Sequence, residues 1–489
     1  RRALLLLLLL LLPSSCCQCL AFGSSIPSRR PLASACSVSL LGAATEPDAS
    51  NNNDDVVPVD GRPQQIEKPL DLQAQHPFTS PSQTLRKLAQ FCDDNAVCLF
   101  DIYGDFDSTQ DTSYLRKFES EVATAFGKDD GVFMPSGVMA QSIALLIHSK
   151  SNESGDESLV REGSPSWRRK PSFACHRTSH LLLHEQNGYS ELLNMDAVTL
   201  PMNTGPCGGT VGGSFGVQPL RSIDVEEAIQ AHVMDAAGFD KQSNLSTVMI
   251  ELPHREIGGK LTPWEEVVQM SDLCREHGVA FHCDGARIFE AAAGYNLTLR
   301  QIADPFGSVY VSFYKGLGGL QGAMLLGDNT FCNEGRLWLR RFGGNLYTLL
   351  PYAISAWSGF KARGLGEGGG PTFSDKKDKI RRILRALVDD EDISGIVTFD
   401  PAVPETNMVH GFIRASLEDC GNATKNVAKR TGVSVLSRVR AISNTEDEFK
   451  RGYGCRFEWT IGDANAAIED DIFLETWKAF AIEFAGNVC

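Results

Sequence analysis

From Asp129 onward, short apolar runs rich in β-branched and aromatic residues alternate with segments of helical periodicity. The run Thr247–Leu252 is followed by a helical pattern over Trp264–His277, and then by the runs Val279–Cys283 and Ser308–Phe313. Strands that alternate with helices of this length can pair in parallel, because each helix carries the chain back across the sheet. The pattern therefore predicts an α/β fold with a mostly parallel sheet covered by helices.

The chain is long enough for two domains. Its 489 residues exceed what one hydrophobic core usually supports. A glycine-rich run, Gly364–Gly370, separates the alternating region from a basic amphipathic helix at Asp375–Val388 and from further alternating segments. We expect a large domain over residues 78–366, with a surface insertion at 150–171, and a small α+β domain over 371–489.

The N-terminal region has a different composition. Two arginines precede an unbroken leucine run, Leu4–Leu12, and small polar residues follow, which is the order of a secretory signal peptide. The next stretch has arginines, many serines and no acid, as in a transit peptide. We expect residues 1–40 to lead the chain into the secretory route, either to a complex plastid or to the endomembrane system and the outside of the cell, and residues 41–77 to form a disordered linker.

Composition excludes several classes of protein. A hydrophobic fraction of 42% with 22% charged residues excludes a wholly disordered or multi-span membrane chain, and nine leucines are too few to cross a bilayer. The net charge of -15 disfavours binding to nucleic acid. Outside the first 40 residues no C-x-x-C pair occurs, so neither a metal site nor a disulfide framework is expected.

Two reactive side chains follow neighbouring predicted strands. Asp284 ends an apolar strand, where ligands of open α/β sheets bind, and a buried carboxylate there could keep a heterocyclic nitrogen protonated. Lys315 follows the next strand and is flanked by aromatic residues and glycines; desolvation would lower its pKa from about 10.4 and free a neutral amine. Taken alone, the aspartate is more often a helix cap and the lysine a solvated surface residue.

A third segment has the form of a phosphate cradle. Ser136 and Gly137 form a tight turn between an apolar run and an apolar helix, and Val138 offers a backbone N–H. The free N–H groups at a helix N-terminus favour an anion, although Pro-Ser-Gly also describes an ordinary turn.

Three of the ten histidines lie together between Cys175 and Glu185. His180 could stack on a cofactor ring, and another imidazole could act in proton transfer. For each of them, a hydrogen-bonded core histidine is an equally good interpretation. The segment has no matching set of acids or cysteines for a metal ion.

Together these segments resemble the threonine aldolase and aromatic amino acid β-eliminating lyase family of enzymes dependent on pyridoxal 5′-phosphate, which have the aspartate-aminotransferase-like fold type I. The resemblance rests on His282–Ala292, on Ser308–Gly318 and on Ile250–Gly259, and it runs from about Phe100 to Val409. It implies a homodimer or homotetramer whose substrate is a small molecule, an amino acid.

The resemblance also implies a role for each candidate residue. Lys315 would hold the cofactor as a Schiff base, Asp284 would pair with the pyridine nitrogen, and His180 would stack on the ring. The phosphate turn would be Ser136, Gly137 and Val138. The residues implied in substrate binding are Arg287, Arg456 and His254, and Arg287 is implied to lie near either the phenolic oxygen of the cofactor or the substrate carboxylate.

One departure from the family concerns the substrate. Threonine aldolases usually begin their folded part with Phe-Arg-Ser-Asp-Thr, whereas this chain reads Phe78-Thr-Ser-Pro-Ser. The missing arginine removes a charged hydrogen bond of about 1.5–3 kcal/mol, so the substrate preference is expected to differ.

The expected reaction is retro-aldol cleavage of a β-hydroxy amino acid, of the threonine or allo-threonine type, to glycine and an aldehyde. The base would be His180, His184 or His254. β-Elimination from another amino acid is the enzymatic alternative, and a catalytically silent cofactor-binding protein is the alternative from a different class.

Overall fold

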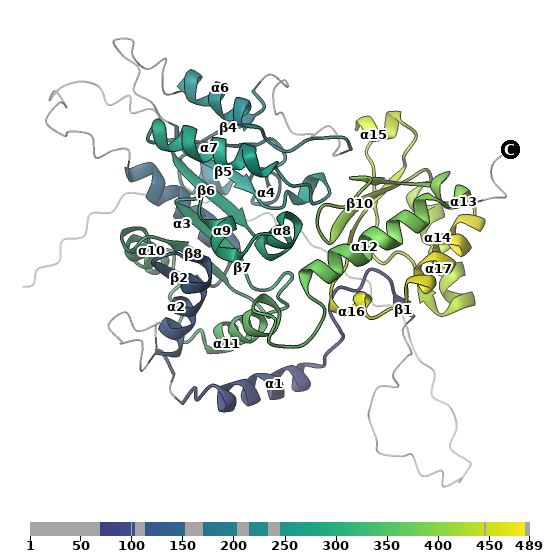
Figure 1. The fold of residues 1–489 in the computed structure, drawn as a ribbon, viewed down its shortest axis with the longest axis horizontal. Helices are drawn as coiled ribbons and strands as arrows, with labels where there is room; N and C mark the ends of the chain where they lie inside the picture. Colours follow the sequence, from purple (N-terminus) through teal and green to yellow (C-terminus); the bar gives the residue numbers. More distant parts are fainter. Residues whose placement is uncertain are drawn as a thin grey trace, which may run out of the picture. The chain divides into compact units, whose positions relative to one another are not determined.

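The computed structural model describes residues 69–98, 100–102, 113–151, 170–202, 215–232, 245–444 and 446–484. The leader predicted at 1–40, most of the linker predicted at 41–77 and most of the insertion predicted at 150–171 lie outside these ranges. The described chain has a seven-stranded sheet (the larger sheet), a four-stranded sheet (the smaller sheet), a two-stranded sheet and the helices that cover them (Figure 1).

The larger sheet has seven strands in the order β2-β8-β7-β6-β5-β3-β4. Strands β7, β6, β5, β3 and β4 pair in parallel, and β8 runs antiparallel to both of its neighbours. The predicted mostly parallel α/β sheet is therefore confirmed. Its strands are β2 (Asp130–Met134), β3 (Ser172–His176), β4 (Asp196–Leu200), β5 (Leu245–Glu251), β6 (Ala280–Gly285), β7 (Ser308–Ser312) and β8 (Ala323–Gly327).

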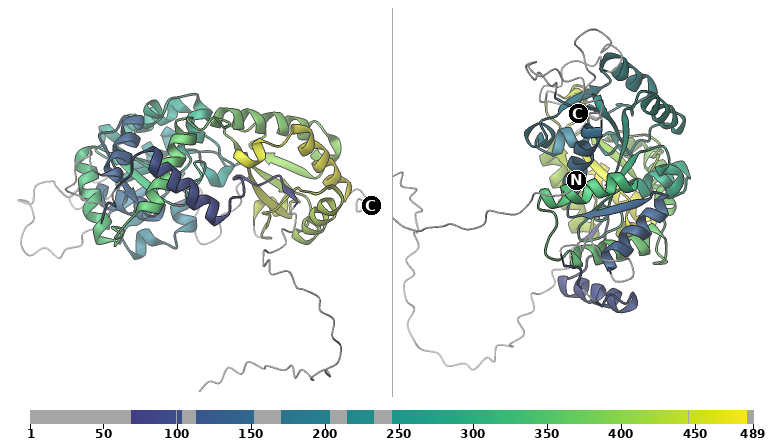
Figure 2. Two further views of the ribbon diagram at one scale, coloured as in Figure 1. Left: turned by 90° about the horizontal axis from the view of Figure 1, so that it is seen from below. Right: turned by 90° about the vertical axis from the view of Figure 1, so that its left-hand side faces the viewer.

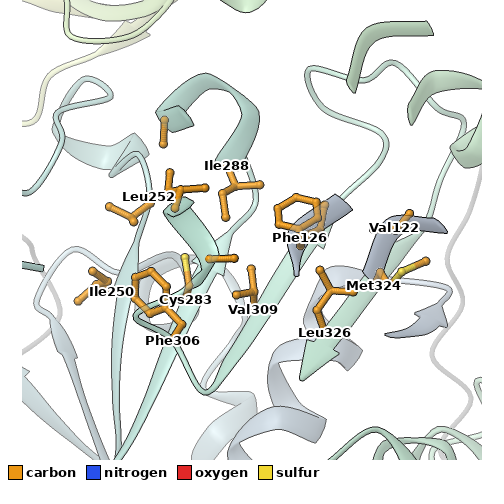
Figure 3. Packing of buried hydrophobic residues seen from close by; sticks show 14 of the residues in the cluster. Val122, Phe126, Ile250, Leu252, Cys283, Ile288, Phe306, Val309, Met324 and Leu326 are labelled. Atoms are coloured by element: carbon orange, nitrogen blue, oxygen red, sulfur yellow. The ribbon is translucent and has the colours of Figure 1, made fainter. Parts of the chain in front are cut away.

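Helices cover both faces of this sheet, because successive strand side chains point to opposite sides. On β8, Met324 and Leu326 enter one core with Val122 and Phe126, while Leu325 enters a second core on the other face. Figure 3 shows the first of these cores. The helices are α1 (Pro81–Asp94), α2 (Tyr114–Phe126), α3 (Gly137–Ser151), α4 (His180–His184), α5 (Gly188–Glu191), α6 (Ser222–His232), η4 (Arg255–Ile257), α7 (Trp264–Glu276), α8 (Ile288–Tyr295), α9 (Leu299–Ala303), α10 (Asn329–Arg341), α11 (Leu350–Gly359) and the π-helical turn η5 (Phe360–Gly364).

The smaller sheet is antiparallel, in the order β12-β13-β10-β9, as the predicted α+β character requires. Helix α12 packs against both α8 and α17 (Figure 2). The remaining elements are α12 (Phe373–Val388), α13 (Glu391–Ser394), β9 (Val397–Asp400), β10 (Met408–Ile413), α14 (Leu417–Thr431), β11 (Val433–Ser434), β12 (Arg440–Ala441), α15 (Asp447–Lys450), β13 (Cys455–Thr460), α16 (Asp463–Ala466) and α17 (Asp470–Ile482).

The predicted linker extends too far towards the C-terminus. Strand β1 (Leu70–Asp71) pairs in parallel with β11, and the side chain of Leu72 is fully buried in the core of the smaller sheet. The carbonyl of Leu72 accepts hydrogen bonds from Trp459 Nε1 at 3.1 Å and from Asn465 Nδ2 at 3.0 Å. The composition of this polar stretch does not reveal the strand, because its two residues pair with Val433 and Ser434, which are far away in the sequence.

Candidate active site

The carboxyl ends of β5, β6 and β7 lie side by side and form the floor of a pocket. Glu251 of β5 stands opposite Asp284 of β6, which in turn stands opposite Tyr310 of β7. Lys315 lies three residues beyond the end of β7. Six of the nine predicted site residues line this one pocket: Gly137, Val138, His180, Asp284, Arg287 and Lys315.

The carboxylate of Asp284 is buried at the floor of the pocket. Burial, reinforced by the neighbouring charge of Glu251, raises the pKa of Asp284 to about 6, although Lys315 and His180 oppose the rise. Its Oδ1 accepts a hydrogen bond from the backbone N–H of Ala286 at 3.0 Å. The carboxylate of Asp284 is therefore held in place, and its negative charge is only partly compensated. Such a group is suited to pair with a buried cation.

The pKa of Lys315 is shifted in the opposite direction to that of Asp284. Burial and the nearby charge of Arg287 lower the pKa of Lys315 to about 8, with Asp284 and Glu251 opposing the change. A substantial fraction of the amine is therefore neutral near pH 8, which is the form that attacks a carbonyl. The sequence prediction of a desolvated lysine agrees with this geometry.

The turn before α3 presents backbone donors to the pocket. The N–H groups of Gly137 and Val138 belong to the first turn of the helix and have no acceptor within it. Ser136 does not line the pocket; its Oγ lies 3.3 Å from the N–H of Met139 and caps the helix. An anion at this turn would therefore be bound by backbone groups, and the serine hydroxyl supports the helix.

Gly137 is required by close packing, since a Cβ at this position would overlap the hydroxyl of Tyr310. We expect Gly137→Ala to lower the free energy of unfolding by about 1–3 kcal/mol, measured by urea denaturation. Gly188→Ala is the matched control, because Gly188 also begins a helix and a Cβ there would meet no atom within 4 Å. A change within about 0.5 kcal/mol is expected there. Equal effects of the two substitutions would contradict the packing argument.

Two histidine–glutamate pairs stand at one side of the pocket. His180 Nδ1 lies 3.1 Å from Glu185 Oε1, and its backbone N–H donates to Glu251 Oε1 at 2.6 Å. The hydrogen bond with Glu185 raises the pKa of His180, although burial opposes the rise. His184 Nε2 lies 2.7 Å from Glu256 Oε1, and the two imidazole rings are 4.9 Å apart. His180 lines the pocket, whereas His184 does not.

Two further predicted residues do not line the pocket. His254 is buried, with Nε2 2.9 Å from Thr178 Oγ1 and its ring packed edge-on against His176. Arg456 forms an ion pair with Glu446 at 3.4 Å. The structure thus gives both residues local partners, and their substrate-binding roles remain predictions.

The segment at Phe78, where the family motif departs, does not line the pocket either. Ser80 caps α1, accepting from the N–H of Gln83 while the Gln83 side chain accepts from the N–H of Ser80. In this chain, the segment that carries the substrate-binding arginine in the family therefore forms the start of helix α1.

Sequence reasoning also missed seven polar or aromatic residues of the pocket. Glu251 ends β5 and could have been found by the strand-end rule that located Asp284, and Arg255 follows four residues later. Tyr310, Tyr314 and Glu256 lie in the three segments that carry the family resemblance, whereas Gln141 and Glu185 do not. The missed residues are Gln141, Glu185, Glu251, Arg255, Glu256, Tyr310 and Tyr314.

The described residues fit pyridoxal phosphate by the chemistry of their donors. A partly neutral lysine, a buried carboxylate and a helix N-terminus meet in one pocket, at a turn that only glycine can form without overlap. Within the described ranges, no group of three or more histidine, cysteine or acidic side chains is arranged to hold a metal ion. The fold and the site define the class as pyridoxal-phosphate-dependent enzymes of fold type I, and solved structures of that class share the fold.

Within this class the chain belongs to the β-eliminating lyase family, whose model matches residues 102–362. A solved structure from Listeria monocytogenes, described as a candidate L-allo-threonine aldolase, is 30% identical, with a TM-score of 0.66 over 85% of this chain and 97% of that one. A candidate aromatic amino acid β-eliminating lyase/threonine aldolase from Exiguobacterium is 27% identical, with a TM-score of 0.65 over 86% and 98%.

Sequence matches to curated proteins cover less. The low specificity L-threonine aldolase of Saccharomyces cerevisiae is 27% identical over 244 residues, which is 50% of this chain and 53% of that protein. Among the first such relatives, the matching region spans between 53% and 63% of their own length. None of the described helices combines the length and apolar character needed to cross a membrane.

Proposed function

We propose that the protein is a pyridoxal-phosphate-dependent carbon–carbon lyase that cleaves a β-hydroxy amino acid, of the threonine or allo-threonine type, to glycine and an aldehyde. The observation that carries the proposal is the meeting of Lys315, Asp284 and His180 in one pocket. Relatives named as threonine aldolases or as candidate threonine aldolases support the substrate class.

Each residue has a distinct task in this reaction. When bound, pyridoxal phosphate supplies a carbonyl that reacts with amines and a ring that accepts electrons released at Cα. Lys315 would hold it covalently, and Asp284 would keep its ring nitrogen protonated. The N–H groups of Gly137 and Val138 would bind its phosphate, and Arg287 would bind the carboxylate of the substrate.

The structure favours His180 as the base among the three histidines considered. His180 lines the pocket beside Lys315, and Glu185 orients its ring through Nδ1, which leaves Nε2 as the proton acceptor. His254 uses its Nε2 in the contact with Thr178, and His184 uses its Nε2 in the contact with Glu256. Nε2 of His180 would take the proton of the β-hydroxyl group.

A pH profile tests this assignment. A base must be neutral to act, so kcat should fall as the pH decreases through the pKa of His180, which Glu185 raises. We expect Glu185→Gln to shift this acidic limb to lower pH, because the amide no longer stabilises the imidazolium. Glu334→Gln, on α10 outside the pocket, should leave the limb unchanged. A limb that stays in place in Glu185→Gln would exclude His180 as the titrating group.

Product identification tests the reaction itself. The reconstituted protein is incubated with L-threonine, L-allo-threonine, phenylserine and S-alkyl cysteines, and the products are identified by mass spectrometry. Glycine plus an aldehyde supports the proposal. A keto acid plus ammonia would instead assign β-elimination, and the absence of any product would leave a silent binding protein.

A further inference from the structure

A carboxylate of the smaller sheet already occupies the two arginines of the pocket. Glu458 Oε2 lies 2.7 Å from Arg255 Nε, and Glu458 Oε1 lies 3.4 Å from Arg287 Nη2. Arg255 follows β5 and Arg287 follows β6, and both line the pocket. Glu458 belongs to β13 and does not line it. One side chain therefore spans both guanidinium groups, with one oxygen on each.

This arrangement is the one that the carboxylate of an amino acid would need. A planar carboxylate accepts from guanidinium N–H groups through both oxygens. Although burial opposes it, the charges of Arg287 and Arg255 hold the pKa of Glu458 below its usual value, so the side chain stays ionised near neutral pH. A second carboxylate beside an ionised Glu458 would be repelled unless the existing contact were released.

The two contacts of Glu458 differ in strength. Arg255 is also held by Glu256, whose Oε1 lies 2.6 Å from Arg255 Nη1. The contact of Glu458 with Arg287 is longer, at 3.4 Å. The guanidinium of Arg287 is therefore the one more easily given up to an incoming anion, while Arg255 keeps Glu458 close by.

We propose that Glu458 is a specificity-determining residue, which competes with the carboxylate of the substrate for Arg287. Binding of an amino acid is then an exchange of one carboxylate for another, and its apparent affinity is reduced by the fraction of protein in which Glu458 holds Arg287. An amine without a carboxylate does not have to displace Glu458. The inference rests on the proposed function for the identity of the ligand as an amino acid.

The experiment measures binding and not turnover. The reconstituted protein is titrated with glycine and, separately, with glycinamide, which lacks the carboxylate, and the visible absorbance of the bound cofactor is followed. In Glu458→Gln the Kd for glycine should fall by about five- to tenfold, while the Kd for glycinamide should change by less than about twofold. Glu483→Gln is the control, since Glu483 forms an ion pair with Arg430 at 3.0 Å and neither residue lines the pocket.

The outcomes separate this inference from the proposed function. An unchanged or higher Kd for glycine in Glu458→Gln overturns the inference, and so does an equal change in Glu483→Gln or with glycinamide. If the wild-type absorbance responds to neither ligand, the proposed function fails and the inference fails with it. Thermal unfolding of each variant verifies folding, and Glu458→Ala, which removes both oxygens, should change the Kd in the same direction.

Discussion

Lys315→Ala should abolish the visible absorbance band of the reconstituted protein and lower lyase turnover by at least about 10³-fold. Lys315 is the lysine that lines the pocket, and burial together with Arg287 keeps its pKa at about 8, so its amine is available for a covalent bond. Alanine removes that amine without adding bulk. The measurement is an absorbance spectrum after reconstitution and dialysis, followed by a product assay.

Lys128→Ala is the matched control for this substitution. Burial also lowers the pKa of Lys128, but its Nζ donates to the carbonyl of Phe306 at 2.6 Å, outside the pocket. The control variant should retain the band and the turnover. Persistence of the band in Lys315→Ala would refute the assignment of the covalent lysine.

Asp284→Asn should have opposite effects on activity and on stability. A neutral amide cannot keep the ring nitrogen of the cofactor charged, so kcat should fall by about 10²–10⁴-fold while the visible band remains. In the cofactor-free protein, burial and Glu251 raise the pKa of Asp284 to about 6, above its unfolded value. The charged form therefore costs stability at pH 7, and this cost disappears as the pH falls through 6.

Asparagine removes that cost. The Tm of cofactor-free Asp284→Asn should exceed that of the wild type by roughly 2–4 °C at pH 7, and the difference should shrink as the pH is lowered towards 4. Scanning calorimetry at several pH values measures it. Asp272→Asn, a substitution of an exposed carboxylate, should show no comparable gain. A lower Tm for Asp284→Asn at pH 7 would mean that the carboxylate stabilises the empty pocket.

The parts of the site that could be predicted are those fixed by local pattern. Each strand end is visible in the sequence, and the carboxyl ends of parallel strands meet at one edge, so Asp284 and Lys315 could be placed together. The sheet order and the antiparallel direction of β8 could not be predicted, because they depend on pairing between segments that are distant in the sequence.

The small-domain contribution shows where sequence reasoning stops. The family resemblance predicts a substrate-binding role for Arg456 and none for Glu458, although alternation along β13 puts both side chains on the same face. Arg456 and Glu458 are distinguished only by the register of β13 against β10 and by the contact of Glu458 with Arg255. The alternating pattern of the strand predicts neither of these.

The burial of Leu72 has a consequence for how the chain is synthesised. This residue leaves the ribosome before the larger sheet exists, yet its carbonyl serves Trp459 and Asn465, near the other end of the chain. A fragment that starts at residue 371 would lack this acceptor and would have a gap in its core. The smaller sheet can thus be completed only after translation has passed β13, because Leu72 has neither of these partners before then.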